Sequence, residues 1–169
     1  SVVFENLFPL QKAKLGETHS DTLRTQSSLG ASYWGQGRFD QSVPLIEDTL
    51  RKQEQLLGPE NRDTLAAAEN LLINYKSAKR VDQLFELEIV WLPRLMKAYG
   101  PSHRTTGKFV QSFLADARTR DRMPDSIPVQ ELVLDEVSRQ LGPDHPGVLE
   151  IMNNLAASYW KAGSLERSI

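Results

Sequence analysis

The phrase Leu57-Gly58-Pro59-Glu60-Asn61 has counterparts along the whole chain at one fixed interval. Leu15-Gly16, Tyr99-Gly100 and Leu141-Gly142 occupy the same position, and neighbouring glycines lie 42 residues apart (58 − 16 = 42). A period of this length is typical of solenoid proteins, in which each unit buries its apolar face only against neighbouring units. The repeat therefore predicts a solenoid, whose function depends on an extended surface rather than on one enclosed site.

Each copy contains the pattern of two helices. Apolar side chains recur at helical spacing over about residues 21–35, which we name helix A, and over about 40–57, which we name helix B. A glycine such as Gly37 permits the tight turn between them, and the repeated Leu-Gly phrase ends helix B, because glycine caps a helix and a following proline cannot continue it. Pro44 and Pro128 are expected in the first turn of helix B. The apolar positions that helix A shares among copies are Leu23, Leu65 and Leu149, then Leu29, Leu71, Phe113 and Leu155, then Tyr33, Tyr75 and Tyr159.

One polar position stands just ahead of every helix A. It is occupied by His19, Asn61, His103 and His145, and asparagine is a strong helix N-cap, so we interpret the position as a cap or loop lock. The three histidines are spread along the array, whereas metal binding or acid–base catalysis requires side chains that converge. The chain also lacks cysteine, a phosphate-binding glycine loop and a Gly-x-Ser-x-Gly phrase. We therefore expect no catalytic residue, no metal site and no cofactor.

Composition favours a globular chain that stays out of membranes. Apolar residues make up 40% and charged residues 25%, and no apolar run approaches the length of a membrane span. We expect a cytoplasmic protein with no membrane partner. The net charge of −2 gives no general attraction to nucleic acid, although residues 75–122 carry ten Lys or Arg against five Asp or Glu. The ordinary interpretation of this basic band is a solvated helix surface, and RNA binding is the weaker alternative.

The phrase Leu141-Gly142-Pro143-Asp144-His145-Pro146, followed by Asn153-Asn154-Leu155-Ala156-Ala157-Ser158-Tyr159 and then Gly163, carries a family resemblance. It resembles the tetratricopeptide repeat, and more specifically the 42-residue repeat of kinesin light chains. The resemblance implies an all-α fold, a right-handed α-α solenoid of antiparallel helix pairs, over residues 1–169. Residues 1–15 would end a preceding repeat, 16–57, 58–99 and 100–141 would be full repeats, and 142–169 would begin the next, so we expect a segment of a longer array or an array whose ends pair with something.

The third copy departs from this pattern. Gly107 lies inside its helix A, Ala117 replaces the tyrosine, and the charged segment 118–124 stands where the small turn residue belongs. We expect looser packing or an altered turn there. Pro93, in the body of the second helix B, should kink that helix.

In tetratricopeptide arrays helix A lines the concave surface, so the resemblance implies a peptide-binding groove along its outward positions. These candidate groove residues are Arg24, Ser27, Trp34, Glu69, Asn70, Ile73, Lys76, Lys108, Gln111, Arg118, Asn153 and Trp160. In kinesin light chain-like repeats the asparagines of the Asn-Asn-Leu-Ala phrase can contact the ligand backbone. Asn153 matches that phrase and Asn70 matches its second residue, and bonding to the adjacent helix is the alternative role.

Trp34, Lys76, Arg118 and Trp160 share one repeat position near the end of helix A. Two cations between two tryptophans could hold an acidic peptide that carries an aromatic or apolar anchor. The alternative is that the tryptophans cover the neighbouring repeat while the cations are merely solvated.

The sequence thus predicts a non-catalytic scaffold that binds a peptide or protein segment in the helix-A groove. The alternative is a regulatory or sensor segment of a larger signalling protein, controlling an attached kinase, nucleotide-switch or protease domain. Self-association through exposed terminal helices is a further expectation.

Overall fold

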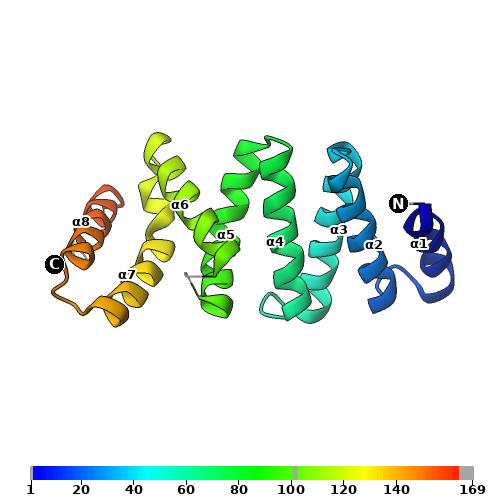
Figure 1. Cartoon of the computed structure of the whole chain (residues 1–169), viewed down its shortest axis with the longest axis horizontal. Helices are drawn as coiled ribbons and strands as arrows, with labels where there is room; N and C mark the ends of the chain where they lie inside the picture. Colours follow the sequence, from blue (N-terminus) through cyan, green and yellow to red (C-terminus); the bar gives the residue numbers. More distant parts are fainter. Residues whose placement is uncertain (1, 101–102, 164–169) are drawn as a thin grey trace. The chain divides into compact units, whose positions relative to one another are not determined.

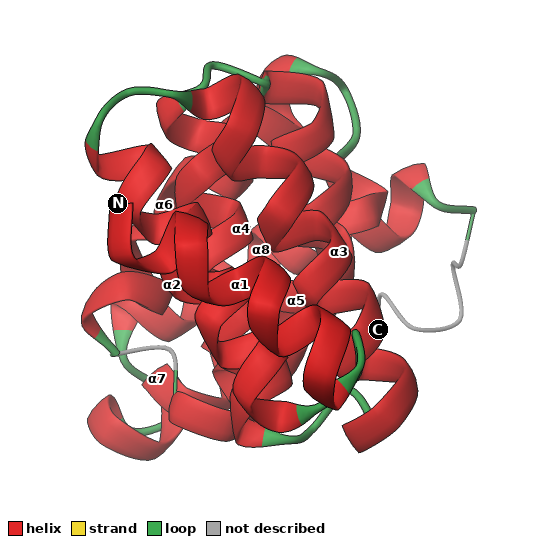
Figure 2. Cartoon of the chain, turned by 90° about the vertical axis from the view of Figure 1, so that its right-hand side faces the viewer, coloured by secondary structure: helices red, strands yellow, loops and turns green. Residues whose placement is uncertain are grey.

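The computed structural model describes residues 2–100 and 103–163. These residues form helices and no strand, as Figures 1 and 2 show, so the expected all-α fold class is confirmed. The helices are α1 (Val2–Leu15), α2 (Ser20–Gly35), α3 (Phe39–Leu57), α4 (Arg62–Ser77), α5 (Val81–Tyr99), α6 (Arg104–Thr119), the 3-10 helix η1 (Met123–Ser126), α7 (Ile127–Leu141) and α8 (Pro146–Lys161). The predicted helices A and B of the first copy are α2 and α3, each within one residue of the expected start. No helix among the described residues is long and apolar enough to span a bilayer.

The chain divides into two compact units, residues 1–84 and 85–169, named unit 1 and unit 2 below. The repeat boundaries expected from the sequence stay a prediction.

The repeated glycines end the helices as predicted. Gly16, Gly58, Gly100 and Gly142 have φ values of 92°, 84°, 83° and 88°, a left-handed region that side-chain-bearing residues avoid. The polar position ahead of helix A caps three of the four helices through its side chain. His19 accepts the Asp21 N–H at 3.2 Å, Asn61 accepts the Asp63 N–H at 2.9 Å, and His145 accepts the Gly147 N–H at 3.1 Å. His103 has the same extended backbone but makes no such cap bond. Pro101 and the 164–166 part of the last hairpin phrase lie outside the described residues.

In unit 1, α3 packs against both α2 and α4, and α1 packs against α2. A polar junction holds α2, α3 and α4 together. The Ser42 hydroxyl of α3 lies 2.7 Å from the Gly30 carbonyl of α2 and is also hydrogen-bonded to Asn74 of α4. Asn74 in turn donates to the Asn70 carbonyl at 2.8 Å. Since Ser42 and Asn74 are buried, these bonds specify the helix register as well as stabilising it.

A second network joins α2 and α3 to the loop that follows α1. The Gln26 amide donates to the Leu45 carbonyl at 3.2 Å and to the Asp48 carboxylate at 2.8 Å. Lys52 lies 2.6 Å from Asp48 and 3.2 Å from Glu17, so the chain between α1 and α2 is tied to α3. Periodicity alone does not indicate this network.

In unit 2, α7 packs against α8, and η1 packs against α6, α7 and α8. The Gln130 amide of α7 donates to the Ser126 and Ser158 hydroxyls at 2.7 and 2.9 Å. The altered turn expected in the third copy is present as η1, which follows α6. Just ahead of it Arg122 forms ion pairs with Glu86 and, at 2.5 Å, with Asp125.

Two expectations about individual residues are wrong. Leu149 is 49% exposed, and its neighbour Val148 is buried instead. Among the described residues α8 packs against α7 and η1, and these contacts leave Leu149 exposed. Pro44 lies inside α3 beyond its first turn, because the helix begins at Phe39, whereas Pro128 occupies the first turn of α7 as predicted.

Gly30 allows α2 to approach α3 closely. A Cβ atom on Gly30 would lie 2.5 Å from Cδ1 and 2.9 Å from Cγ1 of Ile46, which is completely buried. We expect Gly30→Ala to lower the free energy of unfolding by about 1–3 kcal/mol, measured by denaturant titration. Gly35→Ala, in the same helix with no atom within 4 Å, is the matched control and should not destabilise. Equal losses in both variants would contradict the close-approach account.

The Asp48 network predicts a loss of stability in acid. Burial disfavours the charged carboxylate, but hydrogen bonds from Lys52, Gln26 and Arg51 outweigh burial and lower the pKa of Asp48 from 3.8 to about 2. A group whose pKa is lowered by folding stabilises the fold above its unfolded pKa, and the contribution is lost as the pH falls through the folded pKa. We expect part of the fall in unfolding free energy between about pH 4 and pH 2 to disappear in Asp48→Asn. Identical pH profiles of the two proteins would refute this role of Asp48.

Candidate functional site

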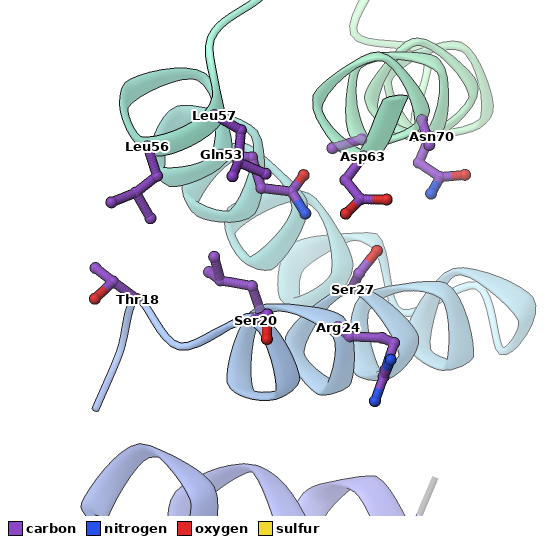
Figure 3. Close-up of a pocket in the computed structure, with 12 residues that line it drawn as sticks. Thr18, Ser20, Arg24, Ser27, Gln53, Leu56, Leu57, Asp63 and Asn70 are labelled. Atoms are coloured by element: carbon purple, nitrogen blue, oxygen red, sulfur yellow. The ribbon is translucent and has the colours of Figure 1, made fainter. Parts of the chain in front are cut away.

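A cavity of about 490 Å³ lies between α2 and α4 in unit 1 (Figure 3). Residues of α2, α4, the end of α3 and the loop before α2 line it: Thr18, Ser20, Leu23, Arg24, Ser27, Gln53, Leu56, Leu57, Asp63, Ala66, Ala67 and Asn70. Arg24, Ser27 and Asn70 were predicted as groove residues from the sequence, and the structure brings these three to one cavity. The volume is within the range of ordinary ligand sites.

The cavity follows from the local sequence of three helices. Because α3 packs against both α2 and α4, its last turns lie beside the space between the two A helices. Ala66 and Ala67 of α4 leave room where longer side chains would fill the space. Leu56 and Leu57, at the end of α3, stay exposed and give the cavity an apolar border.

Two polar side chains of the lining were not singled out from the sequence. Gln53 is only 8% exposed, and its Oε1 has no hydrogen-bond partner among the described residues. The Asp63 carboxylate forms no ion pair within the described part of the chain. A comparison of repeat positions could have found Asp63, because Ala66 stands at the position from which Arg24 neutralises Asp21. It does not single out Gln53, because Gln11 stands at the same position one repeat earlier.

The other predicted groove residues of unit 1 lie outside this lining. Trp34 is 41% exposed, and its indole N–H donates to the Ser77 hydroxyl at the end of α4 over 2.9 Å. This bond is what the alternative role predicts, in which the tryptophan covers the neighbouring repeat. Lys76 is exposed in the last turn of α4, and Glu69 and Ile73 are half-buried on the same helix.

Unit 2 has a smaller cavity, of about 190 Å³, at α6, η1 and α8. Arg118, Met123, Asn154, Ala157, Ser158 and Lys161 line it. The Arg118 guanidinium has no ion pair among the described residues, whereas Lys161 is paired with Asp121 and lowers the pKa of that carboxyl group. Within the described part of the chain this cavity therefore offers one positive charge without an ion pair.

The remaining predicted residues of unit 2 are exposed but do not line this cavity. They are Lys108, Gln111, Asn153 and Trp160, and Trp160 is 66% exposed. Asn154 rather than Asn153 contributes to the cavity. Since Trp34 and Lys76 belong to unit 1 and Arg118 and Trp160 to unit 2, the four-residue row as a whole stays a prediction.

The lining of both cavities combines apolar side chains with amides, hydroxyls and single charges. Within the described residues no group of three or more His, Cys, Asp or Glu side chains is arranged to hold a metal ion.

Comparison with known proteins agrees with this architecture. Residues 22–63 match the family model of the tetratricopeptide repeat. A crystal structure of nearly identical TPR-like repeats of a putative kinesin light chain from Podosopora anserina shares 20% identity with a TM-score of 0.61, covering 98% of this chain and 78% of that one. A single-substitution variant of that protein gives 20% identity and a TM-score of 0.62 over the same shares.

BtubC (BKLC) from P. vanneervenii shares 16% identity with a TM-score of 0.57, covering 99% of this chain and 66% of that one. No curated protein sequence matches the chain. At these identities the structural likeness establishes the fold. The chain thus has the fold of a tetratricopeptide array of the kinesin light chain-like type.

Proposed function

We propose that the chain is a non-catalytic scaffold that binds a peptide or protein segment along its A helices. Tetratricopeptide folds generally serve protein–protein interaction, and the observation that carries the proposal here is the cavity between α2 and α4. Three residues expected to line a groove, Arg24, Ser27 and Asn70, line this cavity. Small side chains leave it open, while amide and hydroxyl groups offer hydrogen bonds to a peptide backbone.

We propose further that part of the partner is acidic and carries an aromatic or apolar anchor. Arg118 supplies a positive charge without an ion pair among the described residues, and Trp160 of the same unit exposes most of its surface. Charge-assisted hydrogen bonds to a carboxylate and stacking on an exposed indole are both common at binding sites. Lys76 and Trp34, both exposed near the ends of α4 and α2, would extend this surface in unit 1. Cytoplasmic location, self-association and the alternative role as a regulatory segment stay predictions.

Charge reversal tests the acidic partner. The probes are short fluorescent peptides with one tryptophan among acidic residues, and matched peptides with lysine in place of the acids. We expect the acidic peptides to bind preferentially, and the double variant Lys76→Glu with Arg118→Glu to weaken them by about tenfold, measured by fluorescence anisotropy. Binding that survives moderate salt would separate this aromatic-anchored mode from the steeper salt dependence of phosphate contacts to RNA.

The matched control is Lys14→Glu with Lys97→Glu. These lysines are exposed in the last turns of α1 and α5, as Lys76 and Arg118 are in the last turns of α4 and α6, so the change in net charge and in helix-end electrostatics is the same. The control should bind like the unmodified chain. Equal weakening in both double variants would show that overall charge, rather than the groove, attracts the peptide.

A further inference from the structure

His19 faces two groups of Asp21 with the same ring nitrogen. Its Nδ1 accepts the backbone N–H of Asp21 at 3.2 Å and lies 3.9 Å from the carboxylate oxygen Oδ2 of the same residue. Only an unprotonated ring nitrogen accepts a hydrogen bond, so the cap requires the neutral ring with its proton on Nε2. A protonated Nδ1 can only donate, and the Asp21 carboxylate is then the partner within reach. The protonation state of His19 therefore decides which group of Asp21 it binds.

The Asp21 N–H depends on this cap because it has no acceptor inside α2. It belongs to the first turn, whose backbone N–H groups lack a carbonyl partner within the helix. A backbone bond of 3.0 Å from the Leu23 N–H to the His19 carbonyl closes this turn. Loss of a side-chain cap destabilises the start of a helix. His19 thus controls the order of the first turn of α2.

This helix start forms part of the wall of the cavity between α2 and α4. His19 stands between Thr18 and Ser20, and both of these residues line the cavity of about 490 Å³ (Figure 3). Arg24, one turn further along α2, lines the cavity as well and is paired with Asp21 at 2.6 Å. A change of partner at His19 therefore reaches the cavity through its two neighbours and through the Asp21 carboxylate.

The charged groups around His19 keep their charge near neutral pH, whereas a histidine ordinarily gains its proton between about pH 8 and pH 5. His19 is the one histidine of residues 2–84. In the same loop Glu17 lies 2.6 Å from Lys12 of α1 and 3.2 Å from Lys52 of α3, and hydrogen bonds from both lysines lower the pKa of Glu17. The other charged groups of the helix start and of the facing wall are Asp21 and Arg24 of α2 and Asp63 of α4.

The caps of the other A helices differ from this one in a way that allows comparison. Asn61 caps α4 by accepting the Asp63 N–H at 2.9 Å, and an amide does not titrate. His145 caps α8 through the Gly147 N–H at 3.1 Å, but a glycine stands there in place of an acidic residue. Within the described residues α2 alone combines a capping histidine with a carboxylate two positions later.

We propose that His19 is a pH-sensitive switch in the wall of this cavity. Above about pH 7 the neutral ring caps α2. Below about pH 6 the protonated ring releases the Asp21 N–H and pairs with the Asp21 carboxylate. This change adds one positive charge beside Arg24 and leaves the first turn of α2 less ordered. The switch needs no ligand, so it goes beyond the proposed binding function and can be tested whether or not the acidic peptides bind.

The test is an NMR titration of the ¹⁵N- and ¹³C-labelled chain, without ligand, from about pH 8 to about pH 5. We expect the His19 ring to carry its proton on Nε2 at the upper end of this range. The amide and side-chain carboxyl signals of Asp21, and the amide signals of Thr18 and Ser20, should shift with the same midpoint as the His19 ring. Protection of the Asp21 amide, corrected for the intrinsic pH dependence of hydrogen exchange, should fall by about fivefold as the ring is protonated.

His19→Asn is the matched variant, because asparagine keeps the cap, as Asn61 does in the next copy, and does not titrate. In this variant the Asp21 amide should stay protected over the whole range. The Asp63 amide, which Asn61 caps, is the internal control and should not follow the His19 midpoint in either protein. A response of the Asp21 amide that persists in His19→Asn would overturn the proposal, as would an Asp21 amide or carboxyl group that does not respond to protonation of His19.

Discussion

The packing of α3 against both α2 and α4 is the constraint on which the rest of unit 1 depends. In a solenoid each helix pair can bury its apolar face only against its neighbours, so a B helix must pack against two A helices at once. Ser42 marks the place where this happens, between the Gly30 carbonyl and Asn74, and Gly30 lets the helices come close enough for the contact. Once these contacts set the distance between α2 and α4, the cavity between them is determined by the size of the side chains that face it, which is why Ala66 and Ala67 matter as much as the polar groups.

Local chemistry explains which parts of this fold can be predicted from the sequence. Helix ends depend on a glycine that adopts positive φ and on a cap within two residues, so Gly58 and Asn61 indicate their roles without knowledge of the fold. Gln53 is different, because an apolar pattern treats a glutamine at the end of a helix as a surface residue, and only the packing of α3 shows that its amide is buried. The prediction that Leu149 is buried is wrong for a related reason. Burial of a side chain depends on a partner helix, and the sequence of the helix that carries the side chain does not show whether that partner is present.

The repeated positions give the two units different chemistry while the fold stays the same. On α2 the charges of Asp21 and Arg24 compensate each other. On α4 the residue at the position of Arg24 is Ala66, so the Asp63 carboxylate has no such partner. In unit 2 the Arg118 guanidinium has no ion pair among the described residues. A regular solenoid can therefore carry an irregular sequence of binding preferences, with the backbone geometry preserved by the capping glycines and the buried junctions.

The most direct test of the central claim, that the A helices form the binding surface, is hydrogen–deuterium exchange of the chain with and without a bound acidic tryptophan peptide. The account predicts slower exchange in α2, α4, α6 or α8 on binding, with little change in α3 and α7. Protection confined to the B helices, or to α1 alone, would contradict it and would move the binding surface to the other face of the helix pairs.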